Sequence, residues 1–401
     1  MRLLIWSPNY APELIGIPPL VTEAAEWLVG RGHQVHAVTA LPNYPERRIF
    51  PGYGGRAWRQ ATENGVRVHR SWLRVRPGET VIDKGLYEAS FAAVSAPLVL
   101  AQIRRADVLV CVVPTLMTAA AGALAARATR TRLVLWVQDL VLDAARSVDG
   151  VGGGQARVVE SMRHVEALAL RSAQGIVTCS SGFAPALVAN GANPAAIETV
   201  PNWIDVHRFP EQTEPSSAKT RFLYTGNIGY TQGFETLFAA AAAAGPEIEV
   251  EIVGGGNYAA EARRLASDRV RVSGAVARDA YPDLLASAHA LIVLQRRVAA
   301  NVNLPSKIAS YLAAGRPIAA SIGLETPAAN LLEASGAALI VPPEDPAALA
   351  QAMSRLAGDP SLRRELGARG RAFAAANLSQ ERLLPQLERA LLGHSPETSA
   401  G

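Results

Sequence analysis

The spacing of apolar and polar positions predicts a repeated alternation of buried strands and helices. The chain opens with an apolar strand over Leu3–Trp6, followed by a loop, a helix closed by Gly30 and Gly32, and a second strand starting at Gln34. Strand, helix and strand in about 40 residues form a βαβ unit, which implies a parallel sheet with a right-handed crossover. Further strands are expected at 66–71, 107–113, 132–137, 175–179 and 197–200, and helices at 84–103, 115–128, 155–172 and 182–190.

Between residues 201 and 220 the alternation stops in a stretch rich in Pro, Ser, Thr and charge, which is typical of a linker. We therefore expect a first domain at 1–205, a linker at 206–220, a second domain at 221–375, and a helix with a polar tail at 376–401. Strands of the second domain are expected at 221–224, 248–253, 269–273, 289–294, 317–321 and 338–341, with a helix at 232–244 and a helical tail over 346–393.

This organisation predicts an α/β protein made of two Rossmann-like, doubly wound domains that face a cleft. In open parallel sheets, ligands bind outside the carboxyl ends of the strands. The loops that follow strands are therefore where chemistry is expected.

Composition agrees with this fold class. The chain has 401 residues, 49% of them apolar and 18% charged, which is ordinary for a soluble protein and suits two hydrophobic cores. Cys111 and Cys179 lie in apolar strand-like runs, which predicts buried thiols in a reducing compartment. The uncharged run Val108–Ala126 is broken by Pro114, so it predicts strand, turn and helix and not a membrane span. Because no cleavable leader pattern opens the chain, we expect a cytoplasmic protein.

Positive charge is concentrated in one region. The formal net charge is +4, and residues 47–76 hold eight arginines against a single acid, Glu63. Two interpretations stay open: a solvated loop region, or a surface for anionic partners such as membrane headgroups or a diphosphate-linked acceptor. No nucleic-acid-binding motif accompanies the charge, so a nucleic-acid partner is not expected.

The first strand–helix loop of each domain offers a ligand something different. The first lacks the Gly-x-Gly-x-x-Gly pattern of nicotinamide enzymes and holds one glycine, Gly16, which either lets the backbone approach a ligand or simply makes a turn. The loop Tyr224–Gly233 holds three glycines between a strand and a helix. Such a loop can present N–H groups to a phosphate, although many ordinary turns carry two glycines.

The segment Asn301–Pro317 carries the sharpest signal. Only three of the 39 basic residues are lysines, and one of them, Lys307, falls in the first turn of a helix expected to follow Asn303 or Leu304. A cation there is unfavourable against the helix dipole unless an anion is bound. We therefore predict a diphosphate site at Lys307, with Ser310 on the same helix face; the alternative is an ordinary surface lysine.

Other candidates are weaker. Asp139 ends an apolar strand, where a carboxylate can bind sugar hydroxyls, orient an acceptor, or merely cap a helix or turn. Asp205 is interpreted as positioning the linker. The seven histidines show no metal-ligand spacing, and the chain has no Asp-x-Asp, nucleophile-elbow or Walker A motif, so no metal is expected.

Taken in order, these features resemble the GT-B glycosyltransferases of family 4 over nearly the whole chain. The nearest branch includes bacterial colanic-acid and O-antigen fucosyl- or fucosaminyltransferase-type enzymes. The matching segments are YAPELIGIPPLVTEAAEWLVGRGHQVHAVTALPNYP, WVQDL, VPNWID, GNIGYTQGFETL, IVGGG and LPSKIASYLAAGRPIAAS.

The resemblance implies a retaining, metal-independent and cofactor-free transfer of a hexosyl group from a nucleoside-diphosphate sugar, with UDP expected above GDP. It places the donor on the second domain. The acceptor (a polysaccharide precursor, lipid-linked sugar or natural product) belongs to the first domain, and the last helix crosses back to it. Lys307 and Asp139 are the catalytic candidates. The implied donor contacts are Gly16, Gly226, Asn227, Gln232, Gly255, Val276, Asn301, Asn303, Leu304, Ser306, Ser310 and Glu325.

The chain departs from the family pattern at two places. Many members carry Glu-x7-Glu, whose positions here correspond to Val302 and Ser310, and many carry Arg and Lys in the glycine loop, where this chain has Asn227 or Ile228 and Gln232. Ser310 can hydrogen-bond a ribose, although more weakly than a carboxylate. Lys307 would supply the missing positive charge, and the donor sugar stays open.

Two other functions stay open. A nucleotide-sugar 2-epimerase on the same fold needs acid–base side chains, which the histidine-poor loops disfavour. The other alternative is a non-catalytic protein that binds nucleotide sugars, and the missing Glu pair is the feature that supports it.

Overall fold

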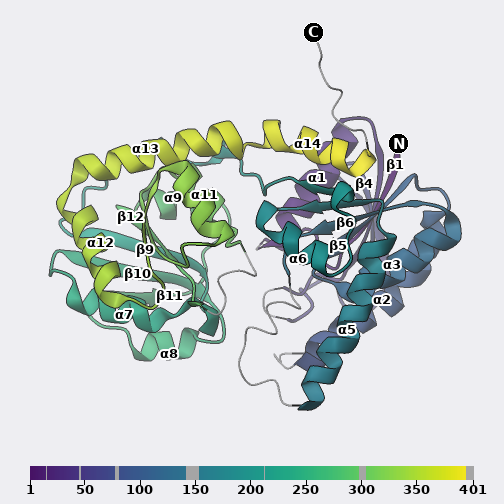
Figure 1. The fold of residues 1–401 in the computed structure, drawn as a ribbon, viewed down its shortest axis with the longest axis horizontal. Coiled ribbons are helices and arrows are strands. Elements are labelled where there is room, and N and C mark those ends of the chain that lie inside the picture. The colour runs from purple at the N-terminus through teal and green to yellow at the C-terminus, as the bar shows by residue number, and fades with distance from the viewer. Residues whose placement is uncertain are drawn as a thin grey trace, which may run out of the picture. The chain divides into compact units, whose positions relative to one another are not determined.

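The computed structural model describes residues 1–14, 16–44, 47–76, 81–140, 153–211, 213–297 and 304–393, without the side chains of 81, 82, 84 and 153–160 (Figure 1). The chain divides into two compact units. The first unit comprises Met1–Pro201 and Leu384–Gly401, and the second comprises Asn202–Leu383.

The first unit is built on a sheet of strand order β3-β4-β2-β1-β5-β6-β7-β8, parallel throughout except for the β3–β4 hairpin. Every residue of the apolar run in β5 is buried, as expected for a central parallel strand covered on both faces. The strands are β1 (Arg2–Trp6), β2 (Gln34–Ala40), β3 (Trp58–Glu63), β4 (Val66–Ser71), β5 (Val108–Val113), β6 (Arg132–Val137), β7 (Gly175–Thr178) and β8 (Ile197–Thr199).

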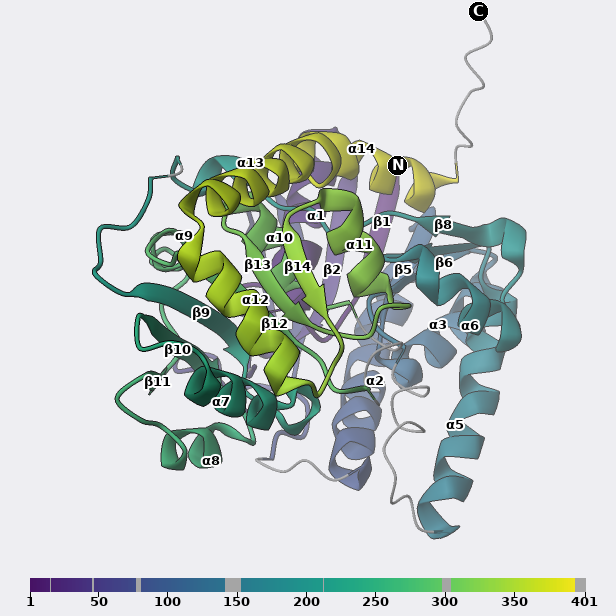
Figure 2. The same cartoon turned by 60° about the vertical axis from the view of Figure 1, so that its left-hand side comes forward.

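Helices cover this sheet, and α3 lies between α2 and α5 in both ribbon views (Figures 1 and 2). Trp6, Phe91 and Phe183 belong to the core between sheet and helices. The helices are α1 (Ile17–Gly30), α2 (Val81–Ile103), α3 (Leu116–Thr129), α5 (Gly153–Ser172) and α6 (Ala184–Ala189), with 3₁₀ turns η1 (Ser181–Phe183) and η2 (Pro194–Ala196).

The second unit holds a fully parallel sheet of strand order β11-β10-β9-β12-β13-β14. This is the order of a dinucleotide-binding fold, with the reversal of direction between β9 and β12. The strands are β9 (Thr220–Asn227), β10 (Ile248–Gly255), β11 (Val270–Ser273), β12 (Ala290–Leu294), β13 (Ile318–Ser321) and β14 (Ala338–Val341). Helical elements are η3 (Val206–Arg208), η4 (Tyr230–Gln232), α7 (Phe234–Ala243), α8 (Ala259–Arg264), α9 (Tyr281–Ala286), α10 (Lys307–Ala313), α11 (Pro327–Ser335), α12 (Pro346–Gly358) and α13 (Pro360–Asn377). The last helix, α14 (Gln380–Leu392), begins in the second unit and belongs mostly to the first.

Most predicted elements are present within a few residues of their expected bounds, including strand, turn and helix over Val108–Ala126. The β3 strand was not predicted, because its mostly polar, exposed residues have no apolar alternation. Another stretch, which was not considered for this property from the sequence, is long and apolar enough to cross a membrane by length and composition: Gly85–Ile103 in α2. The two cysteines are buried and free, as predicted.

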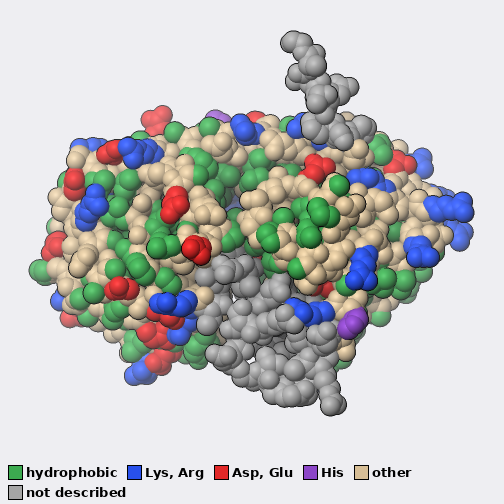
Figure 3. All heavy atoms as spheres, in the orientation of Figure 1, with side chains coloured by type: hydrophobic (Ala, Val, Ile, Leu, Met, Phe, Trp, Pro, Cys, Tyr) green, Lys and Arg blue, Asp and Glu red, His purple; other side chains and the backbone are tan. Residues whose placement is uncertain are grey.

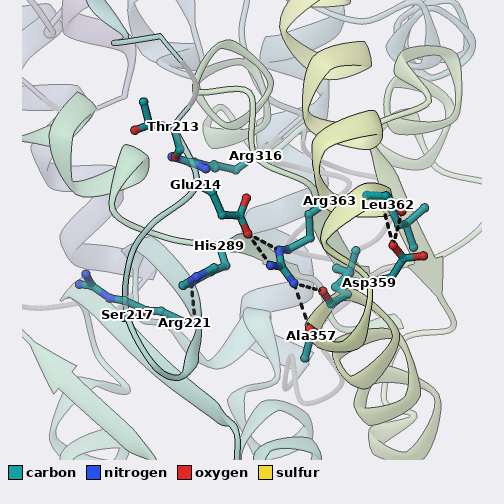
Figure 4. A network of polar contacts seen from close by, with 12 residues as sticks. Thr213, Glu214, Ser217, Arg221, His289, Arg316, Ala357, Asp359, Leu362 and Arg363 are labelled. Atoms are coloured by element: carbon teal, nitrogen blue, oxygen red, sulfur yellow. Dashed lines mark hydrogen bonds and ion pairs between the residues drawn. The ribbon is translucent and has the colours of Figure 1, made fainter.

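The segment that was predicted to be a linker is held to the second unit by polar contacts (Figure 4). Glu214 accepts hydrogen bonds from Arg363 of α13, whose guanidinium also donates to the carbonyls of Leu356 and Ala357. Arg316 donates to the carbonyl of Thr213. Asp205 caps η3 by accepting the N–H of His207. These contacts fix the path of the chain into β9.

Glu214→Gln is expected to destabilise the second unit by about 1–3 kcal/mol, since it leaves the Arg363 guanidinium buried without its counter-ion. The Arg363 side chain is only 8% exposed and that of Glu214 35%. Urea unfolding measures the loss. The matched control, Glu365→Gln, breaks the exposed Glu365–Arg369 pair and should change stability by less than about 1 kcal/mol. Equal effects of the two variants would contradict the structural role of Glu214.

Candidate functional site

Two glycine loops meet at the carboxyl edge of the second sheet. A β-carbon on Gly254 would lie 1.9 Å from the carbonyl oxygen of Gly226, and one on Gly256 would lie 2.4 Å from that of Ile228. Any side chain at these positions would therefore push the loops after β9 and β10 apart. This edge is at the reversal point of the strand order, where ligands bind in such sheets.

Lys307 brings its ammonium to this edge. Its Nζ lies 3.6 Å from the centroid of the Tyr224 ring, and 3.4 Å from where a β-carbon on Gly226 would lie. The Tyr224 hydroxyl donates to the carbonyl of Asn227 at 2.7 Å, which fixes the ring beneath the ammonium. A cation over an aromatic face is stabilised by the ring quadrupole, so the position of the charge is well defined.

The charge on Lys307 is not neutralised by the described part of the chain, where it makes no ion pair. Two arginines that follow β12 are paired with glutamates: Arg296 with Glu235 at 2.8 Å, and Arg297 with Glu344 at 3.9 Å. Loss of water around the ammonium lowers the pKa of Lys307 well below its ordinary value. A desolvated ammonium without a carboxylate is suited to an anionic ligand.

A hydroxyl network lies behind Lys307 and was not predicted. Ser310 Oγ donates to the carbonyl of Lys307 and lies 3.2 Å from the Tyr281 hydroxyl. That hydroxyl is 3.0 Å from Thr225 Oγ1, and the Tyr311 hydroxyl accepts the N–H of Thr225 at 2.8 Å. These bonds tie α10 to β9. The apolar pattern gave no signal for them, because buried tyrosines fit a hydrophobic periodicity as well as leucines do.

Some of the other predicted donor contacts of the second unit lie at the ends of β9 and β10 or in the loop after β9. Gly226, Asn227 and Gly255 are exposed at the strand ends. Gln232 accepts the N–H of Gly229 at 3.0 Å through its side-chain oxygen, so that oxygen already has a partner.

The remaining candidates lie in loops that follow β11, β12 and β13. Val276 and Glu325 are exposed, Leu304 is partly buried, and Ser306 is exposed just before α10. The helix begins later than expected, at Lys307, because Pro305 closes a preceding turn by accepting the N–H of Ile308. Asn301, Val302 and Asn303 lie outside the described residues. Ligand contact by any of these residues stays a prediction.

In the first unit, Gly16 and Asp139 lie in loops after β1 and β6. Gly16 has φ 82° and ψ −125°, a backbone conformation that glycine alone adopts without strain, and it directly precedes α1. Burial raises the pKa of Asp139 to about 7. Its negative charge contributes to raised pKa values at Tyr44 and Cys179, so these side chains are its neighbours.

A buried carboxylate that was not predicted organises the loops of the first unit. Glu13 is 2% exposed and accepts the N–H groups of Asn43 and Tyr44 at 2.7 and 2.9 Å. These bonds join the loop after β1 to the loop after β2. They position Tyr44, and with it the surroundings of Asp139. No local pattern marks Glu13 as buried.

Comparison with known proteins decides the family. Residues 16–203 match the family described as "Glycosyl transferase 4-like domain", and residues 219–359 match "Glycosyl transferases group 1". The chain is 31% identical over 369 residues to the putative colanic acid biosynthesis glycosyl transferase WcaI of Escherichia coli K12, covering 87% of this chain and 90% of the relative. The chain belongs to glycosyltransferase family 4.

Solved structures give this family 4 glycosyltransferase the GT-B fold. Sucrose-phosphate synthase from Thermosynechococcus elongatus matches with a TM-score of 0.77 at 19% identity, over 98% of this chain and 100% of that one. Anabaena HepE in complex with UDP matches with a TM-score of 0.71 at 16% identity, over the same shares. The two parallel-sheet, Rossmann-like domains predicted from the sequence are thus confirmed.

Lys307→Met should raise the thermal midpoint of the nucleotide-free glycosyltransferase. A lysine whose pKa is lowered by folding destabilises the fold at every pH below that lowered pKa, and the penalty fades as pH rises toward 10.5. A gain of about 1 kcal/mol in stability would raise the thermal midpoint by about 2–4 °C in a domain of this size. Calorimetry at neutral and alkaline pH measures the gain, which should shrink at alkaline pH. The exposed Lys219→Met is the control, and a lower midpoint for Lys307→Met would contradict the uncompensated charge.

Asp139→Asn should flatten the dependence of stability on pH. The unfolded carboxyl ionises at an ordinary pKa of 3.8, whereas the folded one holds its proton up to about 7. The native protein therefore loses stability as pH rises between these values, and the loss is complete above about 7. Urea unfolding at about pH 5 and about pH 8 measures the difference, with the exposed Asp268→Asn as control. If Asp139→Asn loses as much stability between these two pH values as the control does, ionisation of Asp139 does not cause the loss.

Proposed function

We propose that this glycosyltransferase transfers a hexosyl group with retention of configuration from a UDP-sugar to a polysaccharide precursor. The Lys307 ammonium, placed at the reversal point of the second sheet without a carboxylate partner in the described residues, carries the proposal. We propose UDP over GDP because the similar structure of HepE is in complex with UDP. We propose a polysaccharide precursor as acceptor because the relative WcaI is named for colanic acid biosynthesis.

In the proposed step, the bond between the anomeric carbon and the diphosphate oxygen breaks, and its electron pair stays on that oxygen. The acceptor hydroxyl oxygen bonds to the anomeric carbon from the same face, and its proton passes to the leaving phosphate. Negative charge grows on the diphosphate, where Lys307 and the N–H groups of the 226–233 loop would stabilise it in place of a metal. The ring of Tyr224 would hold the ammonium in position.

On the acceptor side, we propose that Asp139 orients the acceptor hydroxyl. A carboxyl with a pKa of about 7 exchanges protons near neutral pH, which suits hydrogen bonding to a hydroxyl in either state. We also propose that the protein works in the cytoplasm at the inner face of the membrane, where it would meet a lipid-linked precursor.

Turnover with UDP-sugars should persist in EDTA and depend on Lys307. Lys307→Ala is expected to lower kcat by about 10²–10³, because the interaction is made to charge that develops during the reaction. Lys219→Ala, a loss of an exposed lysine in the same unit, should leave kcat unchanged. Release of nucleotide in the presence of lipid-linked acceptor fractions is the readout. An unchanged kcat in Lys307→Ala would contradict the proposed role.

The same assay separates the alternative functions. Incubation with nucleotide sugar alone should leave it almost unchanged, whereas an epimerase would convert it. A non-catalytic binding protein would be stabilised by UDP but release no nucleotide with any acceptor. Abolition of turnover by EDTA would overturn metal independence.

A further inference from the structure

Helix α2 has an exposed face without charge. Leu86, Ala89, Ala93, Pro97 and Leu100 are all exposed and recur at intervals of three and four residues, so they form one stripe along the helix. Leu86 is 44% and Leu100 57% exposed. Only 22% of Gly85–Ile103 is buried in the protein. A surface helix normally carries polar residues on such a face, so this one is suited to an apolar environment.

The single charged residue between Gly85 and Ile103 does not interrupt the stripe. Glu88 accepts the backbone N–H groups of Leu116 and Met117, so its carboxylate is used at the start of α3. The exposed indole of Trp58, from the edge strand β3, extends the apolar surface. Its Nε1 donates to the carbonyl of Val94 on α2 at 2.9 Å.

The opposite face of α2 shows that the helix does not cross a membrane. Phe91, Val99 and Ile103 are fully buried in the core of the first unit. Ser95 accepts a hydrogen bond from the indole of Trp6 at 2.9 Å. Because this face belongs to the fold, the helix can only lie along a membrane surface with its outer stripe immersed.

Arginines lie at both ends of α2. Arg47 lies over the Tyr87 ring, and Arg74 is 3.5 Å from Asp83 in the first turn. Arg104 and Arg105 follow the last turn. In the space-filling view, Lys and Arg side chains gather toward the right-hand edge of the first unit (Figure 3). The charge around the stripe complements an anionic surface.

We propose that the outer stripe of α2, with Trp58 and the flanking arginines, docks this protein on an anionic phospholipid bilayer. The apolar side chains would enter the boundary between headgroups and acyl chains, while the arginines would contact phosphates. This inference rests on the membrane contact in the proposed function and assigns that contact to a surface. Vesicle binding can be measured without sugar transfer, so the two proposals can fail separately.

Co-sedimentation with vesicles of phosphatidylcholine and phosphatidylglycerol tests the proposal. The native chain should bind these vesicles at low salt, bind pure phosphatidylcholine more weakly, and dissociate as salt is raised. Leu86→Gln with Leu100→Gln should weaken binding about tenfold or more, since glutamine keeps helix propensity but removes apolar area. Arg104→Gln with Arg105→Gln should weaken binding to anionic vesicles by a similar factor.

Matched controls come from exposed residues elsewhere. Leu168→Gln with Val188→Gln removes two exposed apolar side chains from α5 and α6, and Arg355→Gln with Arg364→Gln removes two exposed charges from the second unit. Both should bind vesicles like the native chain, and all variants should keep their stabilisation by UDP. Native-like binding by the leucine variant, or equal losses in the controls, would overturn the proposal. Light scattering that shows a native dimer dissociated by the leucine substitutions would instead assign the stripe to a second copy of the chain.

Discussion

The close approach of two backbones at Gly226 and Gly254 sets the geometry of the second unit's functional edge. The strands β9 and β10 pair in register to their last residues, so their loops leave the sheet side by side. With no β-carbon between them, the loops pack at a separation that no other residue permits. The Tyr224 ring and the Lys307 ammonium lie at this same edge, the latter 3.4 Å from where a β-carbon on Gly226 would lie.

Lys307 illustrates how a fold keeps a charge that is costly to bury. The Tyr224 ring lies under the ammonium without neutralising it, and the tyrosine–threonine–serine hydroxyls tie the helix that carries Lys307 to β9. Among the described residues the ammonium has no carboxylate partner, so its charge is available to an anionic ligand. In the proposed reaction, this ammonium would take the place of the divalent ion that many phosphate-handling enzymes use.

The sequence predicted most of the architecture because both units alternate apolar strands with helices at clear periods. It also located Lys307, since lysine scarcity and position in a first turn are visible without a structure. The strand β3 was missed because edge strands need no apolar alternation. Glu13 and Tyr281 were missed because their partners are distant in sequence, and Asn301 and Asn303 stay predictions. The Arg-rich region is not uniform: Arg70 is buried and paired with Glu63, whereas Arg59 is exposed, and the partner of this surface stays a prediction.

The backbone bond between Ile204 and Leu378 has a topological consequence. The second unit is one continuous segment, and the chain enters and leaves it at residues joined by a 2.7 Å hydrogen bond and a parallel bridge from Ile204 to Ser379. The first unit, in contrast, is assembled from both ends of the chain, with Glu388 of α14 bonded to Arg31 and His33. The second unit therefore has the form of a domain inserted into the first, with its two ends adjacent. It is a single stretch of the chain, whereas a first unit truncated after residue 201 would lack the part of α14 that bonds to Arg31 and His33.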